Sequence, residues 1–479
     1  MTEALCRLPA TVLRVLIAQK QVSPVELTRA VLRRAMELQP VLNCFITLAP
    51  EPALAAAAEA ERAVMAGEEL GLLHGIPCSV KDIVNTAGMR TTFGSRLLAE
   101  NVPAEDAAAV ARLRGHRAII FGKTTTPEFG TKCVTDAPLF GRTRNAWSAG
   151  ATSGGSSGGA AVAVASGIGP IAVATDGGGS TRIPAACNGV VGLKQSLGAI
   201  PHSQVPDAFG NYTYVTPTTR TVGDTALMLQ AMGGPHDSDP WSIGVPVPDY
   251  LDAARPEGDL SGKRVLFCAA PPGRPLAVEV ERAFRTVLGH LESLGAKLEE
   301  FDGAELEVEP IWRAINHTTW RARFAPMAER DGDRMCPSLL KQLAAVREVS
   351  GVEYQQAMFD RAALFRRVQA LFGRADFLVT PTLMRSALPI EADPFARNPQ
   401  GEIEIDGVTH EGVRSNWFPW TMPFNLTGHP AISLPAGFDE AGLPLAVQLV
   451  APLRADAPLL RAAALLEAQL DLLGRWPDP

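Results

Sequence analysis

Apolar residues recur at two different spacings along the 479-residue chain, and the spacing changes near residue 70. Before that point a helical period places four of them on one face: Leu27, Val31, Ala35 and Leu38. Residues 23–26 (SPVE) have the pattern of a capping box at the start of this helix. A second, alanine-rich helix is predicted over 51–66, with Gly67 as its stop. Residues 1–70 are therefore expected to form a helical N-terminal part.

After residue 70, short apolar runs end in polar or glycine-rich segments. Residues 76–80 end at Lys81, residues 118–121 end at Gly122-Lys123, and residues 171–174 lead into 176–180 (DGGGS). Runs of this kind, separated by helical stretches, predict the buried strands of a mixed, mostly parallel sheet with helices on both faces. Open α/β sheets place their sites at the carboxyl ends of such strands, so 71–200 is the expected functional core.

The second half of the chain continues the α/β pattern. Residues 236–310 contain a predicted strand–helix–strand unit, over 264–268, 276–294 and 296–301, and later strands are predicted at 377–379, 431–434 and 446–450. The segment 381–416 is rich in proline, glycine and charge, which predicts a long loop over the site. Without an internal repeat or a linker, the simplest interpretation is one α/β domain over 1–479.

Composition narrows the function classes. Hydrophobic residues make up 46% and charged residues 20%, and the net charge of −7 favours neither nucleic acid nor an anionic membrane as a partner. The seven cysteines are dispersed without C-x-x-C spacing, which argues against a zinc site and for a cytoplasmic protein with reduced thiols. No window has the pattern of a secretory signal or a membrane span. The sequence leaves open whether the chain forms a homodimer.

Two glycine–serine clusters carry the strongest chemical signal: residues 154–159 (GGSSGG) and 175–184 (TDGGGSTRIP). Such clusters are often plain flexible loops. The second cluster, however, follows a predicted strand and leads into a predicted helix. Three glycines before Ser180 allow the backbone to approach a ligand closely, with N–H groups that could stabilise an oxyanion.

Glycine-rich loops also occur in nucleotide-binding sites and around the nucleophile of esterases. Neither cluster has the spacing of the dinucleotide fingerprint, and Arg117 stands where a phosphate loop ending at Gly122-Lys123-Thr124 needs its first glycine. Residues 154–158 match G-x-S-x-G, the nucleophile elbow, which would make Ser156 the nucleophile of an α/β-hydrolase-like esterase. The elbow should follow a strand, and 144–150 (RNAWSAG) is not strand-like. Ser156 therefore ranks below Ser180 as nucleophile.

A serine nucleophile needs a base, because its hydroxyl is weakly acidic. None of the eight histidines stands in a context that demands catalysis. Lys81 ends an apolar run, where it is either a strand-terminal lysine that reaches water or a desolvated neutral amine that could accept a proton.

Taken together, these segments resemble the amidase signature enzymes. The resemblance extends over roughly the whole chain and is densest between residues 75 and 194. Its segments are 75–82 (GIPCSVKD), 122–130 (GKTTTPEFG), 154–159, 176–184 and 423–431 (PFNLTGHPA). In this order and spacing they are highly specific.

The resemblance implies a Ser–Ser–Lys triad that needs no cofactor or metal. Lys81 would be the base, Ser156 the relay serine on a cis peptide, and Ser180, which follows Ser156 by 24 residues, the nucleophile. Backbone N–H groups of Gly177, Gly178, Gly179 and Ser180 would form the oxyanion hole. Ser157, Asp176 and Arg182 would support the site.

The implied reaction is cleavage of the C–N bond of a carboxylic amide through an acyl-enzyme. Esters and carbamates are further candidate substrates, the latter through a carbamoyl-enzyme (urethanase activity). Residues 417–422 (WFPWTM) predict a pocket for an aryl or alkyl group, although core aromatics explain them equally well. A rival interpretation is the amidase-type subunit of a tRNA-dependent amidotransferase, which works inside a complex.

Overall fold

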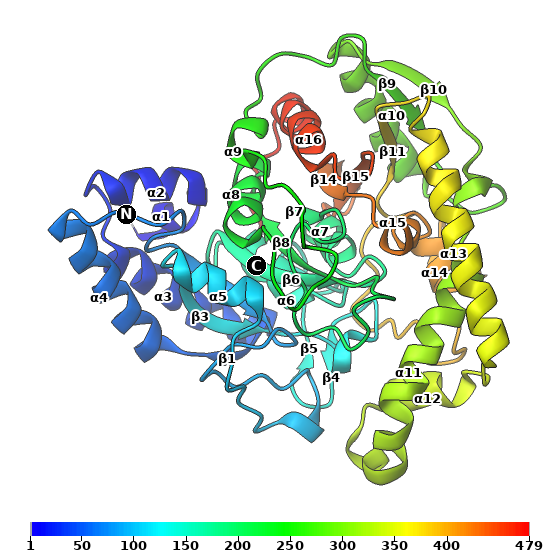
Figure 1. The fold of residues 1–479 in the computed structure, drawn as a ribbon, viewed down its shortest axis with the longest axis horizontal. Coiled ribbons are helices and arrows are strands. Elements are labelled where there is room, and N and C mark those ends of the chain that lie inside the picture. The colour runs from blue at the N-terminus through cyan, green and yellow to red at the C-terminus, as the bar shows by residue number, and fades with distance from the viewer. Residues whose placement is uncertain (1, 479) are drawn as a thin grey trace.

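A single large sheet organises the molecule, as the computed structural model of residues 2–478 shows (Figure 1). Its 11 strands lie in the order β1-β3-β2-β6-β8-β7-β14-β15-β11-β9-β10. Their bounds are Phe45–Leu48 (β1), Pro77–Lys81 (β2), Ile119–Thr124 (β3), Ile171–Asp176 (β6), Val191–Lys194 (β7), Tyr214–Thr219 (β8), Arg264–Phe267 (β9), Lys297–Glu300 (β10), Phe377–Pro381 (β11), Ala431–Phe438 (β14) and Pro444–Val450 (β15).

The predicted mixed α/β sheet is confirmed. Strand β2 pairs in parallel with β3 and β6, and β9 pairs in parallel with β10 and β11. Strands β1, β7 and β8 were not predicted, and all of their pairings are antiparallel. Both β1 and β7 have only four residues, and β8 (YVTPTT) contains a proline and three threonines, so none of the three has the long apolar run typical of a buried strand.

Helices cover both faces of the sheet (Figure 1). Helices α6 and α7 pack together on one face, and α8, α10 and α16 pack together on the other. Helix α11 packs against α12 and α13 at one side of the molecule. The bounds are Thr2–Cys6 (α1), Ala10–Ala18 (α2), Pro24–Leu42 (α3), Pro50–Ala66 (α4), Ala108–Gly115 (α5), Gly158–Ala165 (α6), Arg182–Asn188 (α7), Val222–Met232 (α8), Tyr250–Ala253 (α9), Val278–Ser293 (α10), Glu309–Asp331 (α11), Pro337–Ala345 (α12), Gly351–Leu371 (α13), Val413–Trp417 (α14), Met422–Thr427 (α15) and Asp456–Leu470 (α16).

The N-terminal part is helical as predicted, apart from β1. Ser23 Oγ caps α3 by accepting from the backbone N–H groups of Val25 and Glu26, both at 3.1 Å. The complete capping box was wrong, because no hydrogen bond from the Ser23 backbone N–H to the Glu26 side chain occurs among the described residues. The Ser23 hydroxyl also donates to Glu61. Helix α4 ends at Gly67, which adopts the left-handed conformation expected of a stop.

The segment 381–416 is more than a loop. It contains a two-stranded hairpin, Glu402–Ile405 (β12) and Val408–Glu411 (β13), and most of α14. A second small hairpin is formed by Asp136–Ala137 (β4) and Gly141–Arg142 (β5). These hairpins are too short to produce a strand pattern among the prolines and charges that surround them.

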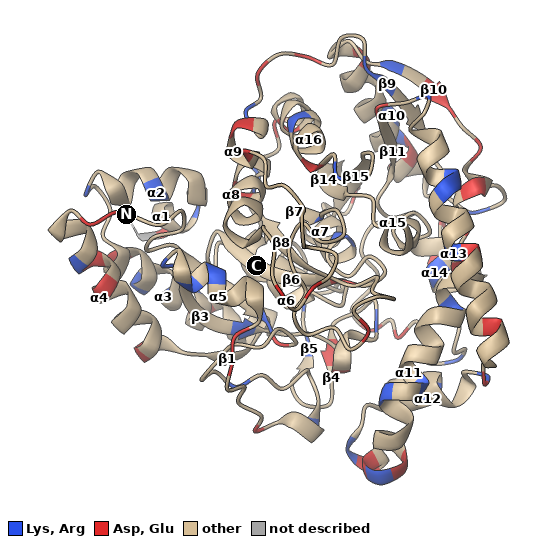
Figure 2. Cartoon of the chain, viewed as in Figure 1, with Lys and Arg blue, Asp and Glu red and all other residues tan. Residues whose placement is uncertain are grey.

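Charged residues of both signs are interspersed over the outer helices and loops, with few on the central strands (Figure 2). The cysteines are all buried and free. Within residues 2–478, none of the helices has the length and apolar character needed to cross a membrane.

Candidate active site

Lys81 is the last residue of β2, and its side chain is fully buried. The Nζ atom lies within hydrogen-bond distance of three hydroxyl groups, those of Ser156 at 2.7 Å, Ser157 at 2.8 Å and Thr175 at 2.8 Å. Strand β2 lies between β3 and β6, so Lys81 ends beside Thr175 in the neighbouring parallel strand β6. The sheet therefore places an amine from one strand end among hydroxyls from two other segments.

The surroundings of Lys81 favour its neutral form. Burial lowers the pKa of the amine well below its ordinary value, and the Asp176 carboxylate opposes that shift. A neutral amine has a lone pair and can accept a proton. The interpretation of Lys81 as a desolvated amine fits this environment, and a solvent-exposed lysine at a strand end does not.

Ser156 and Ser157 lie directly before α6, in a turn that glycines allow to pack closely. The peptide bond between Gly155 and Ser156 is cis, as the resemblance implied. A Cβ on Gly155 would meet the backbone of Val134 at 2.7 Å. Ser157 Oγ also donates to the Thr175 carbonyl at 3.1 Å, which fixes the turn against β6. Ser156 and Ser157 thus reach the same amine from one tightly packed turn.

Ser180 lies in the loop between β6 and α7. Asp176, the last residue of β6, holds this loop in place through hydrogen bonds. The buried carboxylate accepts from Arg182 Nε and Nη2, both at 3.0 Å, and from the Gly179 N–H at 2.6 Å. Asn425 Nδ2 adds a bond at 3.0 Å. Burial alone would raise the pKa of Asp176, but the Arg182 guanidinium and these donors hold it well below its ordinary value. The expectation that Asp176 and Arg182 support the loop fits this geometry.

The same bonds narrow the set of candidate oxyanion donors. The Gly179 N–H is taken by Asp176, whereas those of Gly177, Gly178 and Ser180 have no partner among the described residues. The Gly177 carbonyl accepts from Trp312 Nε1 at 3.3 Å, and the Gly178 carbonyl accepts from Thr421 Oγ1 at 2.7 Å. With its carbonyls held in this way, the loop keeps three N–H groups available for a ligand.

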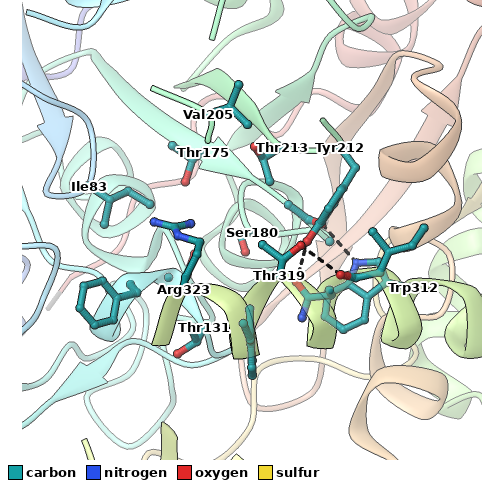
Figure 3. Close-up of a pocket in the computed structure, with 18 of the residues that line it drawn as sticks. Ile83, Thr131, Thr175, Ser180, Val205, Tyr212, Thr213, Trp312, Thr319 and Arg323 are labelled. Carbon is teal, nitrogen blue, oxygen red and sulfur yellow. Dashed lines mark hydrogen bonds between the residues drawn. The ribbon is translucent and has the colours of Figure 1, made fainter. Parts of the chain in front are cut away.

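Ser156 and Ser180 line one cavity of about 460 Å³, shown in close-up in Figure 3. Lys81 is hydrogen-bonded to Ser156 but does not itself line the cavity. No hydrogen bond joins the hydroxyls of Ser156 and Ser180 in residues 2–478. The cavity walls are rich in aromatic residues: Phe93, Phe129, Tyr212, Trp312, Trp320, Phe324, Tyr354, Phe395 and Phe418.

The pocket predicted from 417–422 was wrong for its two tryptophans. Trp417 and Trp420 are 0% and 1% exposed and pack in the core, and Phe418 alone of the six residues lines the cavity. Three of the nine aromatic residues of the wall come from α11, which the sequence interpretation missed. Its signal was present, because Trp312, Trp320 and Phe324 recur at helical spacing on one face.

The elbow alternative loses its structural basis. The residues just before Ser156 form only two isolated bridges, Arg144 with Thr152 and Ala151 with Pro389, and no strand leads directly into the serine. No group of three or more His, Cys, Asp or Glu side chains that could hold a metal ion occurs in the described part of the chain.

Comparisons with known proteins agree with this architecture. The Amidase family model matches residues 26–460. An acylamidase from Rhodococcus erythropolis is 35% identical over 470 residues, which cover 96% of this chain and 95% of the relative. A glutamyl-tRNA(Gln) amidotransferase subunit from Thermosynechococcus vestitus is 33% identical, with coverage of 93% and 95%.

A solved structure has the same fold. The crystal structure of a bacterial aryl acylamidase of the amidase signature family superposes with a TM-score of 0.87 at 29% identity, over 98% of this chain and 99% of the other. The mixed sheet, the buried lysine beside two serines and a family match over most of the length lead to one assignment. The chain belongs to the amidase signature family and is a hydrolase of that family.

Proposed function

We propose that this protein hydrolyses carboxylic amides through an acyl-enzyme on Ser180, with Lys81 as base and Ser156 as proton relay. The observation that carries the proposal is the 2.7 Å contact from the fully buried Lys81 Nζ to Ser156 Oγ, at the wall of the cavity that Ser180 also lines. A buried neutral amine next to a hydroxyl is a suitable base for serine chemistry.

In the first step, the Ser180 oxygen attacks the carbonyl carbon of the amide. Its proton passes to Ser156, whose own proton passes to the neutral Lys81 amine. The negative charge on the carbonyl oxygen meets the N–H groups of Gly177, Gly178 and Ser180, which have no partner among the described residues. Collapse of the tetrahedral intermediate breaks the C–N bond, and the leaving amine takes a proton back through Ser156.

In the second step, water attacks the ester of the acyl-enzyme while the same relay removes its proton. Ser180 then leaves as the free hydroxyl and the carboxylic acid is released. General acid–base catalysis of this kind contributes about 10²–10⁴ in rate. Loss of one oxyanion donor costs about 10²–10³.

The substrate body is proposed to be an aryl or alkyl group. Support comes from the aromatic wall of the cavity and from the similarity to an acylamidase and an aryl acylamidase. The same nucleophile is expected to attack aryl esters, and carbamates through a carbamoyl-enzyme, because both present a carbonyl to the oxyanion donors.

The decisive test is to trap the acyl-enzyme. Rapid acid quenching during turnover of a p-nitrophenyl ester, followed by peptide mass spectrometry, should place the acyl group on Ser180. Ser180→Ala should abolish turnover of both ester and anilide while circular dichroism and thermal unfolding stay unchanged. An adduct on Ser156, or turnover near the wild-type rate in Ser180→Ala, would favour Ser156 as the nucleophile and overturn the proposal.

A second candidate function is supported by the similarity to the glutamyl-tRNA(Gln) amidotransferase protein. A subunit of that kind works inside a complex. The purified chain alone, assayed with an anilide and with glutamine, separates the two functions. Anilide cleavage by the isolated chain supports the stand-alone amidase. Ammonia release from glutamine that needs added partner subunits would favour the amidotransferase.

A further inference from the structure

Arg323 projects from α11 over the cavity, between the labelled positions of Ile83 and Ser180 in Figure 3. Its side chain makes no hydrogen bond and no ion pair with the described residues, and its guanidinium lies 5.2 Å from the centroid of the Phe324 ring. Arg323 is exposed enough to receive a ligand, yet the protein around it lowers its pKa. It is therefore an available cation at the wall of the cavity that contains Ser180.

The other two cations of the cavity wall, Lys132 and Arg414, are buried, unlike Arg323, and contact other protein groups. Lys132 forms an ion pair with Asp136. The Arg414 guanidinium lies over the rings of Trp312 and Phe395, at 5.2 Å and 5.4 Å from their centroids.

The cavity wall has one protein carboxylate, and it forms no ion pair with Arg323. Among its described lining residues, Asp207 is the one acidic residue, and its Oδ1 accepts from the Gly210 N–H at 2.8 Å. Burial lowers the pKa of Arg323 and Tyr212 raises it, and no Asp or Glu side chain contributes. Arg323 therefore carries a positive charge that no carboxylate of the described residues pairs with.

His202 is a second candidate donor near the Arg323 charge. His202 lines the same cavity, and its backbone N–H bonds to Asp239 Oδ2 at 3.0 Å, which fixes the loop. Burial and the nearby charge of Arg323 lower the pKa of His202 to about 4, so the ring is neutral at neutral pH. Its Nδ1 atom is buried without a hydrogen-bond partner among the described residues. With the proton on Nδ1, the neutral imidazole could donate to an acceptor bound near Arg323 after a turn of the ring that uncovers this buried atom.

We propose that this cavity takes amide substrates that carry a carboxylate, which binds to the Arg323 guanidinium with His202 Nδ1 as a second donor. The inference rests on the proposed amide hydrolysis and names its substrate class: an aryl or alkyl amide with an acidic substituent. Guanidinium and carboxylate form paired, charge-assisted hydrogen bonds, and such bonds are the strong ones in a partly desolvated cavity. The aromatic wall accommodates the body of the substrate, and Arg323 selects its charge.

The experiment compares each carboxylate substrate with a neutral analogue of similar shape. 4-Acetamidobenzoate is paired with 4-nitroacetanilide, and N-phenylsuccinamate is paired with 4-nitro-N-phenylbutanamide, so that the charge lies on the amine side or on the acyl side. The full chain and the variants Arg323→Gln, Arg323→Lys and Arg330→Gln are compared by kcat/KM. Arg330 stands on the same helix, is exposed and pairs with Asp331, so its variant controls for loss of a charge on α11.

Arg323→Gln should lower kcat/KM for the carboxylate member of at least one pair by about 10- to 100-fold, the loss expected for a hydrogen bond to a charged group. The neutral member should change by less than about threefold, and Arg330→Gln should change neither. Arg323→Lys should fall in between, because it keeps the charge and loses the paired geometry. Intrinsic reactivity differs within a pair but cancels in the ratio of variant to wild type.

Equal losses for both members of each pair, or no loss for either carboxylate, would overturn the inference. Failure of the proposed function is a separate outcome: a wild-type chain that cleaves none of the four amides is no amidase for them. In that case calorimetric titration of the Ser180→Ala protein with 4-acetamidobenzoate decides the matter. Binding that Arg323→Gln weakens by 10-fold or more supports the carboxylate site, and binding unaffected by Arg323→Gln, or its absence, refutes it.

Discussion

Lys81 illustrates how much a single residue depends on its surroundings. In water its amine would be charged and useless as a base. Inside the protein, burial shifts the pKa downward, and three hydroxyls at 2.7–2.8 Å orient the nitrogen. The same amine thereby becomes a candidate proton acceptor.

The pH profile of amide cleavage tests this base. Only neutral Lys81 can accept a proton, so kcat/KM should rise as pH increases through its lowered pKa and then level off. The apparent pKa should lie clearly below the ordinary lysine value of about 10.4. Lys81→Met should reduce the rate by about 10²–10⁴. A rise centred near 10.4, or a normal rate in Lys81→Met, would remove Lys81 from the mechanism.

At the scale of elements, the close packing at the start of α6 depends on glycine. A Cβ on Gly159, the second residue of the helix, would meet the Thr125 backbone nitrogen at 2.4 Å and the Cys44 carbonyl oxygen at 2.5 Å. Both atoms belong to backbone that cannot move aside cheaply. The close approach of α6 to these segments holds Ser156 and Ser157 against Lys81.

Gly159→Ala should therefore destabilise the fold by about 1–3 kcal/mol or more, as overpacking does in a tight interior. Gly289→Ala is the matched control, because Gly289 lies inside α10 and a Cβ there meets nothing within 4 Å. It should raise stability by up to about 1 kcal/mol through helix propensity. Both values come from urea unfolding, and equal effects of the two substitutions would contradict the packing argument.

Asp176 joins several elements at the base of the loop that contains Ser180. Through Arg182 and Asn425 it links the end of β6 to α7 and α15, and Arg182 continues to Gln448 Oε1 of β15 at 2.7 Å. Each member of this network is completely buried.

Asp176→Asn should lower the free energy of unfolding by about 3–5 kcal/mol, because it leaves the buried Arg182 charge without its partner. Glu281→Gln is the control: it removes an exposed pair with Arg285 and should cost less than about 1 kcal/mol. Denaturant unfolding of both variants measures the difference. A small effect for Asp176→Asn would mean that the network does not stabilise the loop.

At the scale of the whole molecule, the cavity is assembled from segments far apart in the sequence. Ser156 and Ser180 come from turns next to the sheet, Tyr212 from the loop before β8, Trp312 from α11, and Phe418 from the segment after α14. None of these segments forms a site alone.

Because the proposed base is an amine of the chain itself, dialysis against EDTA should leave the rate of amide cleavage unchanged. Elemental analysis before and after dialysis, alongside the rate, is the measurement. A loss of activity that a divalent cation restores would show that the chemistry needs a metal.

The sequence alone determined the elements that depend on local pattern. Apolar runs ending in lysine or glycine predicted β2, β3 and β6, and helical periodicity predicted α3 and α4, because strands and helices follow from the spacing of buried side chains. The glycine–serine clusters gave Ser156 and Ser180 as candidates, the end of an apolar run gave Lys81, and the family resemblance assigned their roles. Their catalytic roles stay predictions.

Only the tertiary structure decided which of these features meet and in what environment. Local pattern placed a lysine at a strand end, but the contact with Ser156 and the desolvation that lowers its pKa come from three segments packed together. The aromatic residues that α11 contributes to the cavity and the unpaired charge of Arg323 depend likewise on where that helix lies. Burial and proximity between distant segments are properties of packing, and no short stretch of sequence contains them.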